Sequence, residues 1–179
     1  MIKRIILQAI IISIAFFSCK KDKKMDELPP ITKTGANTFG CILDNRIFAS
    51  TLKCPRPFSI WPLPCVNASI YRYHPPFNSF TELNIEVKNN KFIENGEVLL
   101  NLRAEVDTVS YKITKIDEGS LSMQENNTNT NYQIDFSKTN LFNATMTNEI
   151  VSGTFELYFK SVNGDTKVLK DGRFDISFR

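Results

Sequence analysis

The sequence predicts an all-β chain with a single antiparallel domain, either a β-sandwich or a small β-barrel. The first observation is strict alternation: TELNIEV (81–87) places three aliphatic side chains on one face and polar side chains on the other. GTFELYF (153–159) and GRFDISFR (172–179) alternate in the same way. A period of two is typical of a strand with one face in the core and the other in water. The second observation is that no stretch of ten or more residues beyond the N-terminal segment has helical periodicity. Short strands joined by tight turns indicate a sandwich or a barrel.

The N-terminal residues 1–18 have the pattern of a secretory signal peptide. Met-Ile-Lys-Arg gives a positive start, and the apolar run from Ile5 to Phe17 is interrupted only by Gln8 and Ser13. A positive region, an apolar region of this length and a small residue before the cleavage point are the parts of a signal peptide. The run is short for a membrane span, which needs about 20 apolar residues. An uncleaved anchor helix is the alternative.

Cys19 follows the small residue Ser18 at the end of this apolar run. The pattern resembles the lipobox of bacterial lipoproteins, in which signal peptidase cuts before a cysteine that then carries diacylglycerol and an acylated amino group. The two bulky residues at 16–17 depart from the usual lipobox and match its looser form in Bacteroidota-type lipoproteins. The resemblance implies a lipid anchor at Cys19 in the outer membrane, on either the periplasmic or the surface face. Each buried acyl methylene would add about 0.8 kcal/mol to the anchoring.

A cluster of lysines follows this cysteine. The formal net charge of the whole chain is +3, and four lysines lie between residues 20 and 24. We expect 19–37, the lipidated cysteine and the charged, Pro- and Thr-containing segment after it, to be a flexible tether, and 38–179 to be the β domain. A nucleic-acid partner is excluded because no basic stripe exists elsewhere.

The strands of the domain are predicted in chain order from alternation and turn residues. Asp44-Asn45 separates strands at 38–43 and 46–52 with a spacing suited to a two-residue hairpin. Asn95-Gly96 and Asn163-Gly164 are further turn signals, Asp171-Gly172 precedes the last strand, and 124–131 is a polar hairpin loop. The remaining candidate strands are 68–73, 97–104, 108–115, 119–124, 131–137 and 143–148.

Three cysteines remain inside the domain. Cys54 and Cys65 bracket the proline-rich segment PRPFSIWPLP, and an exported protein meets oxidising conditions. We therefore favour a Cys54–Cys65 disulfide, which would contribute roughly 2–3 kcal/mol by closing a short loop. Cys41, in TFGCIL, fits a small buried apolar residue. All three connectivities stay open on sequence alone.

Two segments carry a family resemblance. TKTGANTFGCILDNRIF (32–48) and IVSGTFELYFKSVNGDTKVLKDGRFDISF (150–178) resemble the two ends of a Bacteroidota-type outer-membrane lipoprotein family of unknown function. Its members share a Thr-Gly-x-Asn-Thr-Phe-Gly-Cys opening, a Gly-Thr-Phe strand and a closing Asp-Gly-x-Phe-Asp strand. The resemblance implies location and fold and carries no functional residues. Thr108, in DTV (107–109), also resembles O-glycosylation sites of this bacterial group.

Catalytic chemistry has few candidates in the sequence, and we expect no enzyme, cofactor or metal. The single histidine, His74, lies between Tyr73 and two prolines without a nucleophile motif. A zinc site from His74 and the three domain cysteines would lack the close ligand pair of structural zinc sites. The carboxylate pairs Glu94 with Glu97 and Asp117 with Glu118 could serve a hydrolase only if they faced each other across a cleft.

The segment 54–80 has the clearest binding character. It combines six prolines with aromatic and arginine side chains, which recognition surfaces use because rigid rings contribute contact area at low entropy cost. The candidate contact residues are Arg56, Phe58, Trp61, Tyr71, Tyr73 and Phe77. In the alternative interpretation this segment covers one end of the sheet and buries Trp61. We expect a lipid-anchored, non-catalytic binding module with a glycan or protein partner; the alternatives are an accessory subunit of an outer-membrane complex and a carboxylate-based hydrolase.

Overall fold

The computed structural model describes most of the domain. The described residues are 27–51, 65–72, 81–89, 92–93, 96–107, 109–113, 115–147 and 149–178. The strands are β1 (Thr38–Leu43), β2 (Arg46–Ser50), β3 (Cys65–Arg72), β4 (Thr81–Asn89), β5 (Gly96–Val106), β6 (Lys112–Ile113), β7 (Glu118–Glu125), β8 (Thr128–Ile134), β9 (Leu141–Met146), β10 (Ile150–Ser161) and β11 (Thr166–Ser177). The predicted signal peptide and Cys19 lie outside the described residues, so both stay predictions.

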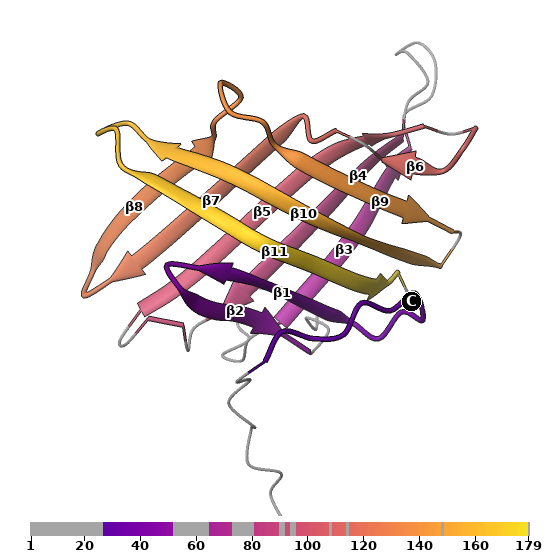
Figure 1. Cartoon of the computed structure of the whole chain (residues 1–179), viewed down its shortest axis with the longest axis horizontal. Coiled ribbons are helices and arrows are strands. Elements are labelled where there is room, and N and C mark those ends of the chain that lie inside the picture. Colours follow the sequence, from indigo (N-terminus) through magenta and orange to yellow (C-terminus); the bar gives the residue numbers. More distant parts are fainter. Residues whose placement is uncertain are drawn as a thin grey trace, which may run out of the picture.

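All eleven strands belong to one antiparallel sheet, which confirms the predicted fold class. The order is β2-β1-β11-β10-β8-β7-β5-β4-β3, with β9 paired to β10 and β6 paired to β9. The long strand β10 pairs with β9 through its first half and with β8 through its last three residues. In Figure 1, β1, β2, β9, β10 and β11 cross the direction of β3, β4, β5 and β7. The sheet is therefore folded over on itself and nearly closed into a barrel.

Side chains close the seam between the two ends of the sheet. The amide of Asn89, at the end of β4, donates a hydrogen bond of 3.1 Å to the carbonyl of Ala49 on β2. The guanidinium of Arg46 donates to the carbonyl of Phe92 and lies 4.4 Å from the centroid of its ring. Because these contacts replace a backbone ladder, β2 approaches β4 without pairing with it.

The core holds the inward side chains of both layers. Leu83, Ile85 and Val87 on β4 are at most 1% exposed, as the alternation predicts. A chain of phenylalanine rings runs through the other layer and ends at Phe92, in the connection between β4 and β5. Neighbouring ring centroids are 5.4–6.3 Å apart, a spacing typical of aromatic pairs. The members of the chain are Phe142, Phe174, Phe155, Phe39, Phe48 and Phe92. These six rings therefore form a continuous aromatic part of the core.

Turn chemistry accounts for most strand boundaries. Asp44 and Asn45 have φ values of 51° and 59°, which is the requirement of a type I′ hairpin. Gly164, in the predicted Asn163-Gly164 turn, also has a positive φ. The polar loop expected at 124–131 is shorter than predicted. Strands β7 and β8 continue through it to a two-residue turn at 126–127.

Two predicted boundaries are corrected. Asp171-Gly172 lies inside β11 as a bulge, because Asp171 has φ 51° and the register with β10 shifts between Phe155 and Leu157. Gly172 is needed because a Cβ there would come within 2.3 Å of the Phe155 ring. The strand expected at 108–115 is reduced to β6, because the carboxylate of Asp107 accepts hydrogen bonds from Val109 and Ser110 and forms a tight turn.

The described part of the predicted tether, 27–37, lies against the domain beside the C-terminal end of β11 (Figure 1). The carboxylate of Asp175 on β11 is 1% exposed and accepts five hydrogen bonds from residues 32–36. Arg173 donates to the carbonyl of Pro29 at 3.0 Å. Pro29 in turn packs on Gly40, where a Cβ would lie 2.4 Å from the proline ring. This segment is therefore part of the folded domain.

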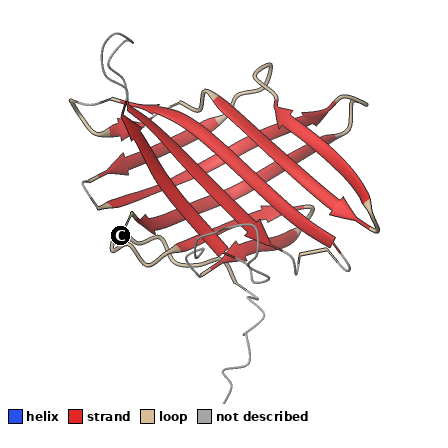
Figure 2. Ribbon diagram, turned by 180° about the vertical axis from the view of Figure 1, so that it is seen from behind, coloured by secondary structure: helices blue, strands red, loops and turns tan. Residues whose placement is uncertain are grey.

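Figure 2 shows the other side of the molecule, where β3, β4, β5 and β7 run side by side. Every regular element in the described part of the chain is a strand. None of the described residues forms a helix long and apolar enough to cross a membrane.

Candidate functional site

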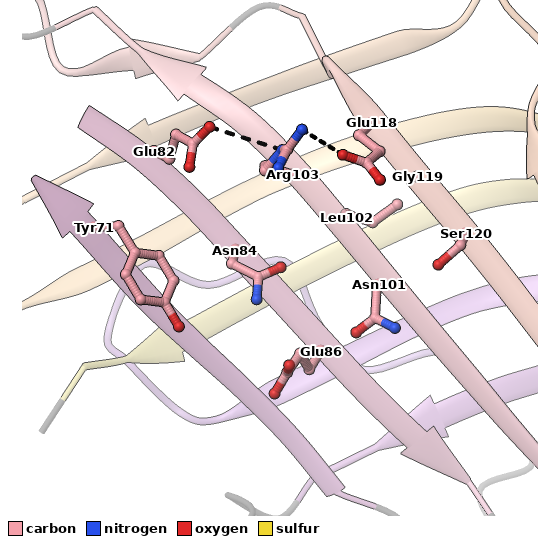
Figure 3. A pocket seen from close by; sticks show the side chains of 10 residues that line it. All are labelled: Tyr71, Glu82, Asn84, Glu86, Asn101, Leu102, Arg103, Glu118, Gly119 and Ser120. Carbon is pink, nitrogen blue, oxygen red and sulfur yellow. Dashed lines mark ion pairs between the residues drawn. The ribbon is translucent and has the colours of Figure 1, made fainter. Parts of the chain in front are cut away.

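The outer face of this layer carries a shallow groove of about 420 Å³ (Figure 3). It spans four neighbouring strands, from β3 at the edge of the sheet to β7. The lining residues are Tyr71, Glu82, Asn84, Glu86, Asn101, Leu102, Arg103, Glu118, Gly119 and Ser120. Most are polar, so the groove is a hydrogen-bonding surface.

Strand register assembles the groove from residues far apart in sequence. Glu86 on β4 pairs with Asn101 on β5, which pairs with Ser120 on β7. The neighbouring row joins Asn84, Arg103 and Glu118. Because these residues alternate with core residues, the sequence pattern that builds the hydrophobic core also places the two polar rows on the outer face.

Charged side chains at one end of the groove neutralise one another in part. The Arg103 guanidinium lies 3.7 Å from the carboxylate of Glu82 and forms an ion pair with Glu118 on the opposite side. Glu82 is only 18% exposed through its side chain, against 49% for Arg103. Arg103 therefore lies between two carboxylates, as the dashed lines in Figure 3 show.

Four other lining side chains have hydrogen-bonding groups without a partner among the described residues. The side chains of Asn84, Glu86, Asn101 and Ser120 are half-buried and make no hydrogen bond or ion pair within the described part of the chain. Half-buried polar groups are usually paired with protein or water. These four are therefore available to water or to a ligand.

Tyr71 forms the edge of the groove on β3. Its side chain is 51% exposed. Tyr71 pairs with Glu82 in the strand register, and Figure 3 shows its ring extending away from Glu82 to the level of Asn84. A half-exposed tyrosine presents an apolar ring face together with a hydroxyl that can donate and accept. Tyr71 is the one predicted contact residue that the structure describes, and it lies at the groove.

The other predicted contact residues cannot be placed. Arg56, Phe58, Trp61, Tyr73 and Phe77 lie outside the described residues, as does Thr108. Asp107 and Val109, on either side of Thr108, lie in an exposed turn and not in the strand expected there. Contact by the segment 54–80 and glycosylation of Thr108 stay predictions.

The cysteines have distinct states. Cys65 is disulfide-bonded, and its expected partner Cys54 lies outside the described residues, so the pairing stays a prediction. Cys41 is a free thiol in the core, and burial raises its pKa. Its predicted role as a small buried apolar residue is confirmed. The zinc set considered from the sequence fails, because the sulfur of Cys65 is not a thiolate and Cys41 is enclosed by apolar side chains.

The carboxylates considered for hydrolysis have other partners. Glu97 forms an ion pair with Lys88 at 2.8 Å, and Asp117 accepts a hydrogen bond from the backbone of Glu105 at 2.6 Å. Glu118 is held by Arg103, and Glu94 lies outside the described residues. The described residues also contain no group of three or more His, Cys, Asp or Glu placed to hold a metal ion.

Sequence reasoning missed Asn84, Glu86, Asn101, Arg103 and Ser120 as members of one site. Each is a polar residue at an outward position of an alternating strand, and many other residues of the chain share that description. Only the register of two strand pairs, β4 with β5 and β5 with β7, brings these side chains together. No family model, curated protein or solved structure matches this chain.

Proposed function

We propose that the chain is a lipid-anchored, non-catalytic binding module of the outer membrane, and that the groove across β3, β4, β5 and β7 is its contact surface. One observation carries the proposal: an exposed aromatic ring borders polar side chains that have no partner in the part of the chain that the structure describes. A few convergent polar groups beside an aromatic side chain are the usual composition of a recognition site.

We propose a non-catalytic module because of how the carboxylates of the groove are paired. Hydrolysis by carboxylates uses two carboxyl groups that face each other across the substrate. Arg103 holds Glu82 and Glu118, so Glu86 is the one lining carboxylate without a partner in the described part of the chain. A single available carboxylate can bind a ligand, but it does not make an acid and base pair.

The anchor part of the proposal rests on the sequence pattern that ends in Cys19. We test it by growing cells with labelled palmitate and comparing the wild type with Cys19→Ala. The wild-type chain should take up label and sediment with membranes, whereas the variant should do neither. Equal labelling and equal sedimentation of the two chains would contradict the anchor.

The groove is tested with a matched pair of tyrosine variants. Tyr71 and Tyr111 are 51% and 47% exposed, but Tyr111 lies in the connection between β5 and β6, away from the lining residues. Immobilised full-length wild type, Tyr71→Ala and Tyr111→Ala are exposed to fluorescently labelled glycans and proteins extracted from the cell envelope. Tyr71→Ala should lose binding and Tyr111→Ala should retain it. Equal binding by the two variants would rule out the groove.

A further inference from the structure

We propose that the ligand of this groove is a short, neutral oligosaccharide. The inference rests on the proposed function, because it names the ligand class of the same site. Three properties of the groove carry it: its charge, its pattern of donors and acceptors, and its position on the face of the sheet.

The charge of the groove disfavours anionic ligands. Its lining contains three carboxylates, on Glu82, Glu86 and Glu118, and one guanidinium, on Arg103. That guanidinium already interacts with two of the carboxylates. A phosphate, a uronic acid or an anionic lipid headgroup would therefore meet a net negative surface without an available cation. A ligand without charge meets no such repulsion.

The donors and acceptors suit the hydroxyl groups of a sugar. A carboxamide both donates and accepts, a serine hydroxyl does the same, and a carboxylate accepts. Glu86, Asn101 and Ser120 present these groups in one row across three strands. A sugar hydroxyl can donate to the carboxylate while accepting from the amide. The ring of Tyr71 can pack against the C–H face of a sugar ring, as aromatic side chains do when one side of a ligand is apolar.

The position of the groove disfavours a peptide. A bound peptide strand usually adds to the edge of a sheet through its main chain. Here nine of the ten lining residues lie on β4, β5 and β7, whose strands are already paired on both sides, and Tyr71 comes from the edge strand β3. The groove crosses three strand spacings of about 4.8 Å, or roughly 14 Å. That length fits an oligosaccharide of a few rings lying across the strands.

The test is calorimetric titration of the full-length chain in a detergent without a sugar headgroup. The probes are neutral tetrasaccharides of glucose, mannose and galactose, with the tetrasaccharide of galacturonic acid as the charged counterpart. We expect at least one neutral probe to bind. Tyr71→Ala and Asn101→Ala should each raise its Kd about tenfold, the cost of one lost ring or hydrogen-bond contact. Tyr111→Ala and Asn143→Ala, which change exposed residues outside the groove, should leave the Kd unchanged.

Three results would overturn the inference. The first is that no neutral probe binds, and the second is that the galacturonic acid probe binds at least as tightly as its neutral counterpart. The third is that the groove variants and their controls lose the same affinity. These results are separable from failure of the proposed function. If Tyr71→Ala still abolishes capture of envelope components while no neutral sugar binds, the ligand class is wrong and the groove stands. If a neutral sugar binds but neither groove variant affects it, the assignment to the groove is wrong.

Discussion

Two polar regions of this molecule, on opposite layers of the sheet, satisfy their side chains in different ways. Asp175, on β11, is buried and accepts five hydrogen bonds from the N-terminal segment. The groove side chains on β4, β5 and β7 are half-buried, and four of them have no partner among the described residues. The residue types are similar. The number of protein partners, more than the residue type, therefore separates the structural polar site at Asp175 from the proposed binding site.

The largest loss of stability should come from replacing Asp175, whose carboxylate accepts five hydrogen bonds. Asp175→Ala leaves the backbone N–H groups of Thr34, Gly35 and Ala36 without an acceptor, and hydrogen bonds to charged groups are the stronger ones. We expect the free energy of unfolding to fall by about 3 kcal/mol, measured from the urea midpoint at constant slope.

The matched control is Asp165→Ala, which removes an exposed carboxylate from the β10–β11 hairpin. Its free energy of unfolding should stay within about 0.5 kcal/mol of the wild type. Equal losses in the two variants would mean that the N-terminal segment does not depend on Asp175, and the contrast between the two regions would fail.

Lowering the pH should also remove the contribution of the Asp175 carboxylate to the free energy of unfolding. Burial raises the pKa of Asp175, but hydrogen bonds from the Thr32 hydroxyl and the backbone of residues 34–36 outweigh it and lower the pKa below its usual value. A group whose pKa is lowered by folding stabilises the protein above its unfolded pKa, about 3.9, and loses that contribution as the pH falls through the folded pKa.

The measurement is the difference in free energy of unfolding between the wild type and Asp175→Asn across pH. This difference should be constant above about pH 5 and shrink below about pH 4. Asp107 and Asp135 also have lowered pKa values, through hydrogen bonds from Ser110 and Ser137, but both proteins retain them and their effect cancels. A difference that stays constant down to about pH 2 would contradict the assignment.

A smaller effect is expected from the ion pairs of the groove. Arg103→Ala removes the cation between Glu82 and Glu118, and exposed ion pairs contribute about 0.5 kcal/mol. The loss should decrease in high salt because screening already weakens the pairs. A loss as large as that of Asp175→Ala would show that the groove holds the fold together, and it would remove the distinction between the two regions.

The smallest change in stability should come from replacing Asn101, whose side-chain amide has no partner among the described residues. Asn101→Ala should change the free energy of unfolding by less than about 0.5 kcal/mol, because no hydrogen bond with a described residue is lost. Thermal unfolding followed by circular dichroism measures the change, with Asn143→Ala as the control on β9. Clear destabilisation by Asn101→Ala alone would assign the amide a structural role.

The sequence predicts the strands better than it predicts how they combine. Alternation and turn residues, such as the pair at 44–45, predict at least part of every strand that the structure describes, because both signals act within a few residues. The sequence predicts a turn at Asp171-Gly172 where the structure has a bulge, because a residue in the left-handed conformation suits a turn and a bulge equally. The hydrogen bond from Thr32 to Asp175 joins residues 143 positions apart in the sequence, so no local sequence pattern predicts it. The groove depends on register across β4, β5 and β7 and is equally non-local.

We propose that a neutral sugar binds the polar groove side chains that have no partner in the described part of the chain. Side-chain amide resonances test it directly, since each asparagine reports its own surroundings. The ¹⁵N-labelled full-length chain is titrated with the neutral glucose, mannose and galactose tetrasaccharides in turn. We expect the amides of Asn84 and Asn101 to shift in a saturable way with one of them while that of Asn143 stays in place. Unchanged Asn84 and Asn101 resonances with all three sugars, or a shift of Asn143 as large as theirs, would contradict the claim.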